Sequence, residues 1–122
     1  MKQIKNCLII DTETNGNQEE PTVLEIGAIF YSVAHQTILS CGSSLIAINP
    51  DLYVTNHAEL INKIPTSVIR TPYCGEAHFR DYLETVYHEA DAIVAHNKSF
   101  DQPLVLKLGF KDKLWLCTNI RL

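Results

Sequence analysis

The first third of the chain contains three apolar runs of the kind that form β-strands. Residues 6–10 form a short continuous apolar run that ends in a polar cluster at residues 11–16, so we expect a buried strand that leads into a loop. Residues 23–33 are rich in β-branched and aromatic side chains, and residues 38–48 form a third run. Pairing these neighbours in chain order predicts a three-stranded antiparallel meander.

A helical period appears only after a long interrupted segment. Residues 49–75 are punctuated by proline and glycine, which predicts mostly irregular structure with one short helix at residues 58–63. From residue 79 onward, apolar side chains recur at every third or fourth position. This spacing predicts an amphipathic helix over residues 76–90.

The last third of the chain predicts a strand, a helix and a strand. Residues 92–95 and 114–117 are brief apolar strands. Between them, Ser99 and Gln102 have the spacing of a capping box, while Pro103 would suit a helix start one or two residues later, and Gly109 suits the residue that ends the helix. The order β-β-β-α-β-α-β predicts an α/β fold, with a mixed sheet made of the meander and crossover units and flanked by helices.

Size and composition narrow the class of protein. With 122 residues and 46% hydrophobic side chains, the chain can build one packed core, and we expect a single domain over residues 1–122. No apolar stretch approaches the roughly 18 residues that cross a bilayer, and no signal-peptide pattern is present, so a cytoplasmic location without membrane contact is expected. The four cysteines lack the spacing of a zinc site and are expected to be free, buried thiols: Cys7, Cys41, Cys74 and Cys117.

The net charge limits how this chain could hold nucleic acid. A formal charge of −4 does not supply the basic footprint that neutralises many phosphates. A nucleic-acid partner would therefore have to be bound at a small local site, for instance through a metal ion.

Two carboxylates at the end of the first strand are the first candidate for such a site. Asp11 and Glu13 are separated by one residue, and because strand side chains alternate, both are expected on one face. Carboxylates are preferred ligands of Mg²⁺ and Mn²⁺, which often act as a pair in phosphoryl transfer. The pattern alone is also that of two solvated acids at a strand end.

A third carboxylate, Asp101, follows another expected strand, near the start of a helix. Two strand ends could bring Asp101 together with Asp11 and Glu13. A carboxylate in a first helical turn can equally be a simple capping or dipole-stabilising group.

Three motifs in order resemble a known family. These are IIDTETNG at residues 9–16, LEIGA at residues 24–28 and AHNKSFD at residues 95–101, and residues 115–118 resemble the strand that follows. Together they resemble the DEDD superfamily of 3′–5′ exonucleases, in particular its DnaQ-like and RNase T-like members, which include the epsilon proofreading type of DNA polymerase III. The resemblance covers nearly the whole chain and implies a ribonuclease H-like fold.

The resemblance also implies roles for individual residues. Asp11, Glu13 and Asp101 would be three of the four acidic ligands of a two-metal Mg²⁺ or Mn²⁺ site. Thr12 and Thr14 would touch the terminal nucleotide, and the residues beside the scissile end would be Asn97 and Phe100. The implied activity is hydrolysis of terminal phosphodiesters of DNA or RNA to nucleoside monophosphates.

The family's third signature, a His or Tyr before a fourth Asp on a C-terminal helix, is not reached before Leu122. His88 and Asp91 are too close together and too early to replace it, and His88 is expected on a helix surface. This chain is therefore expected to lack the usual general base and to be a weak enzyme. Without the family's last helix, apolar side chains near residues 114–116 are expected to be uncovered, which favours self-association or a protein partner, for example of the polymerase type.

Two functional hypotheses follow from these patterns. One is a metal-dependent 3′–5′ exonuclease domain that binds a single-stranded 3′ end. The other is a catalytically incomplete relative that binds nucleic-acid ends or a partner protein.

Overall fold

The computed structural model describes residues 3–46, 54–55, 58, 61–64 and 76–119. Its main elements are, in chain order, β1 (Asn6–Thr14), β2 (Val23–Ser32), β3 (Thr37–Leu45), α3 (Glu76–Glu89), β4 (Ala92–Ala95), α4 (Lys98–Lys107) and β5 (Trp115–Cys117). The expected order of strands and helices is confirmed. The helix expected at residues 58–63 lies partly outside the described residues, and so do residues 47 and 48 of the third expected strand.

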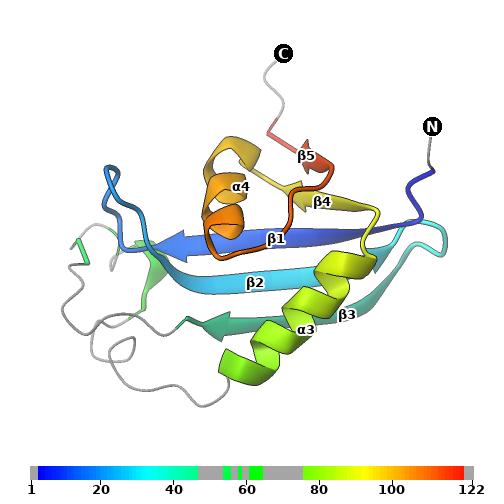
Figure 1. Ribbon diagram of the computed structural model, residues 1–122, viewed down its shortest axis with the longest axis horizontal. Coiled ribbons are helices and arrows are strands. Elements are labelled where there is room, and N and C mark those ends of the chain that lie inside the picture. Colours follow the sequence, from blue (N-terminus) through cyan, green and yellow to red (C-terminus); the bar gives the residue numbers. More distant parts are fainter. Residues whose placement is uncertain (1–2, 47–53, 56–57, 59–60, 65–75, 120–122) are drawn as a thin grey trace.

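The five strands form one mixed sheet in the order β3-β2-β1-β4-β5 (Figure 1). β1 pairs antiparallel with β2, and β2 pairs antiparallel with β3, which is the expected meander. β4 then joins the free side of β1 in parallel, and β5 joins β4 in the same way. The helices α3 and α4 make the crossovers that parallel pairing requires.

Both helices pack on the same face of the sheet. Strand residues that are paired across the sheet share a face, so Leu8, Phe30 and Ile93 point to one side. These side chains belong to a single buried cluster with Leu83 of α3 and Val105 of α4. α3 lies over the β2–β3 side and α4 over the β1–β4 side (Figure 1).

The opposite face of the sheet carries a row of apolar side chains. Cross-strand pairing places Leu116, Val94, Ile9, Ile29 and Cys41 in this row, one from each strand. Within the described part of the chain, Ile9, Cys41 and Leu116 remain exposed. The expectation of uncovered apolar side chains is confirmed for Leu116 and for the neighbouring Leu114.

The same expectation is wrong for Trp115. Its side chain is only 3% exposed, because alternation along β5 turns it toward the helices and into the core. Its indole nitrogen is a buried donor with no hydrogen-bond partner within the described residues.

The first strand is longer than its apolar pattern suggests. The polar cluster from Asp11 to Thr14 was expected to be the start of a loop, but it continues β1. Asp11 is paired with Gly27 and Glu13 with Glu25, so backbone pairing with β2 keeps these polar residues in the sheet. The prediction that Asp11 and Glu13 share one face is confirmed.

The start of α4 also differs from the expectation. The helix begins at Lys98 with Asn97 as the N-cap, and Pro103 lies inside it rather than at its first turn. Ser99 does not cap the helix, because its hydroxyl donates to Oδ1 of Asn97 at 2.9 Å. At the other end, Gly109 has a φ of +100°, which confirms it as the left-handed residue that ends the helix.

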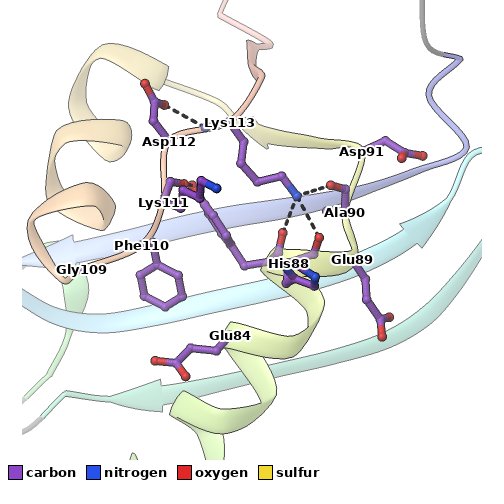
Figure 2. Close-up of a pocket in the computed structure, with 11 residues that line it drawn as sticks. Glu84, His88, Glu89, Ala90, Asp91, Gly109, Phe110, Lys111, Asp112 and Lys113 are labelled. Carbon is purple, nitrogen blue, oxygen red and sulfur yellow. Dashed lines mark hydrogen bonds between the residues drawn. The ribbon is translucent and has the colours of Figure 1, made fainter.

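The segment after α4 folds back onto the end of α3. The ammonium of Lys113 donates to the main-chain carbonyls of Tyr87, at 2.7 Å, and of His88 and Ala90 (Figure 2). These carbonyls have no partner inside the helix, and a cation there also complements the helix dipole. A hollow of about 510 Å³ lies beside Lys113, and the residues that line it connect the end of α3 to the segment before β5.

The cysteine prediction is only partly correct. Cys7, Cys41 and Cys117 are free, as expected, but only Cys7 is buried, and its burial raises the pKa of the thiol. Cys41 is exposed because it lies on the open face of an edge strand. Cys74 lies outside the described residues.

Among the described residues, no helix is both long enough and apolar enough to cross a bilayer.

Candidate functional site

The carboxyl end of β1 directs its side chains to two sides. Ile10 and Thr12 face the helices and are buried, whereas Asp11 is exposed on the opposite face and Glu13 is half-buried there. The alternation follows directly from the strand, which continues through these polar residues. The two candidate carboxylates of β1 therefore lie together at the rim of the open face.

Asp101 reaches the same strand end from α4. It lies in the first turn of the helix and is 4% exposed, and its Oδ1 accepts a 2.5 Å hydrogen bond from the hydroxyl of Thr12. Burial raises the pKa of Asp101, and the nearby charge of Asp11 raises it further, while the Thr12 hydrogen bond acts in the opposite direction. Asp101 is thus close enough to Asp11 for that charge to act on it, although its hydrogen bond is made to Thr12, on the helix-facing side of β1.

Glu13 lies among several negative charges. Burial is the largest cause of its raised pKa, and the charges of Asp11, Glu25 and Asp101 add to it in that order. Glu25 is directly opposite Glu13 in the β1–β2 pairing. Like charges in such cross-strand positions destabilise a sheet, so this end of the fold carries a local electrostatic cost.

We call four residues at this end of the sheet the acidic cluster: Asp11, Glu13, Glu25 and Asp101. Its fit to a divalent cation depends on the chemistry and the placement of these side chains. Carboxylate oxygens are suitable ligands, and a cation would relieve the repulsion that raises the pKa of Glu13. As the side chains stand, the described residues contain no ready-made group of three or more His, Cys, Asp or Glu ligands. The donor chemistry fits a cation, and the side chains would have to turn toward it.

Thr14 and the start of the following loop, at Gly16, line the pocket beside Glu13. Gly16 has a φ of +81°, and a Cβ at this position would lie 2.3 Å from Oγ1 of Thr55 and 2.9 Å from Cβ of Ala58. The loop is held there by the amide of Asn62, which donates to the carbonyl oxygen of Thr14 at 3.3 Å. Only glycine fits this close approach without strain.

Phe100 stands between two hollows at this end of the molecule. A cleft of about 510 Å³ is lined by Thr14, Gly16, Asn17, Gln18, Pro21, Ser99, Phe100, Pro103 and Leu104. A smaller pocket of about 160 Å³ is lined by Thr12, Glu13, Thr14, Gly16, Ala58, Ile61, Asn62 and Phe100. With 42% of its surface exposed, Phe100 presents an aromatic ring directly beside Glu13 and Thr14.

Asn97 occupies the turn before α4. It is exposed, and its main-chain carbonyl accepts hydrogen bonds from the amides of Phe100 and Asp101, both at 3.0 Å. Asn97 therefore positions the first helical turn that carries both residues. Its side chain is held by Ser99 and does not line either hollow.

Several residues at this site have no obvious sequence signal. Glu25 joins the acidic residues of β1 only because the strand register sets it opposite Glu13. Ala58, Ile61 and Asn62 line the pocket from a segment whose pattern was irregular. The isolated Gly16 after a polar run was the one available signal for the close contact with residues 55 and 58.

Solved structures with a similar fold include nucleases. Exonuclease I in complex with the inhibitor BCBP is 19% identical at a TM-score of 0.72, with 95% of this chain and 29% of that chain covered. E. coli exonuclease I in complex with a dT13 oligonucleotide is 19% identical at a TM-score of 0.65, with 82% and 22% covered. Cell-death related nuclease 4 is 15% identical at a TM-score of 0.65, with 89% and 42% covered.

These likenesses establish the fold, which is of the ribonuclease H type. The chain spans about 29% of the exonuclease I chain and 42% of the cell-death related nuclease. No protein-family model and no curated protein sequence matches the chain.

Proposed function

We propose that this chain is a metal-dependent 3′–5′ exonuclease domain of the DEDD type. The observation that supports the proposal is the closeness of Asp11 and Asp101 to Glu13 at the end of β1, where their charges raise the pKa of Glu13, beside a pocket lined by Thr14 and Phe100. The ribonuclease H-type fold, shared with exonuclease I, is consistent with it. The finer likeness to the DnaQ-like, epsilon type rests on the sequence motifs.

The proposed roles follow from where each side chain lies. Asp11, Glu13 and Asp101 would hold Mg²⁺ or Mn²⁺, which when bound would polarise the terminal phosphodiester and activate a water molecule. Glu25, opposite Glu13, adds negative charge that favours a cation at this place. Asp101 would have to exchange its Thr12 hydrogen bond, or share it, to act as a ligand.

The chain's own groups would bind and orient the 3′ end of a single strand of DNA or RNA. The ring of Phe100 offers a surface for stacking a base, and Thr12 and Thr14 lie beside it in the small pocket. Asn97 supports the turn from which Phe100 projects. Attack by water would break the terminal phosphodiester and release a nucleoside monophosphate, leaving a chain that is one nucleotide shorter.

An oligonucleotide assay tests this proposal. Single-stranded DNA and RNA with a 5′ fluorophore are incubated with the protein and Mn²⁺, so that shortening from the 3′ end gives a ladder of labelled products. We expect Glu13→Gln and Asp101→Asn to reduce the rate by about 100-fold or more. Glu20→Gln, in an exposed loop, is the matched control and should keep the wild-type rate. Equal rates for the site variants and the control would contradict the proposal.

A second function is favoured by one specific observation. Asp101 is engaged by Thr12, and no ready-made ligand group exists among the described residues, which suits a domain that binds nucleic-acid ends without cutting them. Fluorescence anisotropy with the same oligonucleotides separates the two functions. Tight binding that Phe100→Ala weakens, without any shortening in Mn²⁺, would favour the binding domain.

A further inference from the structure

The outer edge of β3 is long and lacks the charges and prolines that often protect an edge strand. β3 is the last strand on one side of the sheet, and its nine residues, TILSCGSSL, include no charged residue and no proline. Natural sheets usually blunt such edges with charges, proline, β-bulges or very short strands, because unpaired backbone groups attract another strand. Within the described part of the chain, no strand pairs with this edge.

The exposed side chains of β3 are apolar where they are large. Ile38 and Leu39 are 57% and 52% exposed, and Cys41 is also exposed. One irregularity in the β2–β3 pairing lies between Phe30 and Tyr31. The six pairs from Phe30–Ser40 to Glu25–Leu45 run without a shift, so residues 40–45 form a regular edge.

The other edge of the sheet offers a much shorter partner for β3. β5 is only three residues long, Trp115–Cys117, and offers few backbone groups for pairing. If copies paired edge to edge in a head-to-tail manner, with β3 of one copy against β5 of the next, very few hydrogen bonds would hold them together. Pairing of β3 with β3 uses the long edge twice and closes on itself, as a two-fold symmetric dimer does.

We propose that a second copy of this chain is the partner of the β3 edge, paired antiparallel with it so that the two sheets become continuous. Among symmetric registers, the one centred on Cys41 aligns the two nine-residue strands over their full length, with the irregular position Leu39 opposite Ser43. Like charges oppose each other nowhere in this register, because the strand is uncharged.

This register fixes where the two Cys41 residues lie relative to each other. The two Cys41 residues would lie directly opposite each other, and such antiparallel pairs have Cα atoms roughly 4.5–5.5 Å apart. This separation is within the range that a disulfide bridges. Since opposite residues share a face, the helices of both copies would lie on the same side of the joined sheet.

Light scattering at tens of micromolar protein tests the dimer. We expect twice the 13.8 kDa mass of one chain for the wild type and for Cys41→Ser. Cys41→Lys, which sets two ammonium groups opposite each other, should give the mass of one chain. Leu116→Lys is the matched control: it adds the same charge to another exposed apolar position on the open face and should stay dimeric. Fluorescence of the buried Trp115 verifies folding, and Ser43→Lys replaces Cys41→Lys if that variant is unfolded.

Oxidative cross-linking tests the register. Diamide takes up two protons and two electrons from a pair of thiols and leaves a disulfide. We expect a covalent dimer for the wild type and for Cys117→Ser, and none for Cys41→Ser. A wild type of single-chain mass, larger open-ended polymers, a dimer that survives both lysine variants, or cross-linking that survives Cys41→Ser would each overturn the proposal.

Discussion

The hydroxyl of Thr12 donates a 2.5 Å hydrogen bond to Oδ1 of Asp101, which lies 89 residues later in the chain. The bond connects the core-facing side of β1 to the first turn of α4, where Asp101 is almost completely buried. A buried carboxylate needs such donors, since an unpartnered charge in the interior is costly. Thr12 therefore stabilises the position of a residue that we propose for metal binding.

Thr12→Val should destabilise the protein by about 1.5–3 kcal/mol at neutral pH, because it removes a hydrogen bond to a buried charged group while keeping the side-chain shape. Urea unfolding followed by Trp115 fluorescence measures this. Thr14→Val is the control, since among the described residues the Thr14 hydroxyl accepts just one bond, of 3.3 Å, from the exposed amide of Gly16. The cost of Thr12→Val should shrink in an Asp101→Asn background, and an equal cost in both backgrounds would contradict the assigned bond.

The acidic cluster should make stability depend on pH. The pKa of Asp101 is raised above its ordinary 3.8 in the folded protein, and that of Glu13 above 4.5, both chiefly by burial. The folded state then binds protons more tightly than the unfolded chain, so the free energy of unfolding falls as pH rises through the window above these ordinary values. Asp101→Asn should therefore gain stability relative to wild type between pH of about 4 and neutral, measured in EDTA. A constant difference across this window would refute the assignment.

Most of the fold could be predicted from the periodic spacing of apolar side chains along the chain. The apolar recurrence from Phe79 to Ala90 matches α3, and the runs at residues 6–10 and 23–33 match the cores of β1 and β2. Alternation along a strand was also enough to place Asp11 and Glu13 on one face. These features depend only on neighbours in the chain.

Features that depend on distant partners could not be predicted in the same way. Glu25 lies opposite Glu13 because of the strand register, and the Thr12–Asp101 bond depends on how α4 docks against β1. The residues from Asp11 to Thr14 look like a loop in the sequence, and only pairing with β2 makes them a strand. Cys41 looked like a core thiol, but its strand is at the edge of the sheet.

Mn²⁺ should bind at the acidic cluster and stabilise the fold. Ligand binding to the native state raises the unfolding temperature as the free ligand exceeds its Kd, and relief of repulsion at Glu13 supplies the driving force. Thermal unfolding with increasing Mn²⁺ should show a shift for wild type and for the Glu20→Gln control. Asp11→Ala should lose most of that shift, and indistinguishable titrations of wild type and Asp11→Ala would rule out this site.

Lys113 should be important for stability through the end of α3. Replacing it with Met keeps the stem but removes the ammonium that contacts the carbonyls of Tyr87, His88 and Ala90, so we expect a loss of about 1.5–3 kcal/mol. Lys111→Met is the control, because the exposed Lys111 contributes its main-chain carbonyl, not its side chain, to the Tyr87 hydroxyl. Urea unfolding of both variants measures the difference, and equal losses would contradict this role.

Two glycines at the candidate site should respond to alanine in opposite ways. Gly16 has a φ of +81°, and an added Cβ would meet Thr55 and Ala58, so Gly16→Ala should cost about 1–3 kcal/mol or more and push the loop away from the pocket. Gly27 lies in β2 opposite Asp11, and an added Cβ there would meet nothing within 4 Å. Gly27→Ala should therefore be neutral or stabilise by up to about 1 kcal/mol, since it reduces the freedom of the unfolded chain. Chemical denaturation ranks the two variants against wild type, and a Gly16→Ala protein as stable as Gly27→Ala would show that residues 55 and 58 do not pack on this loop.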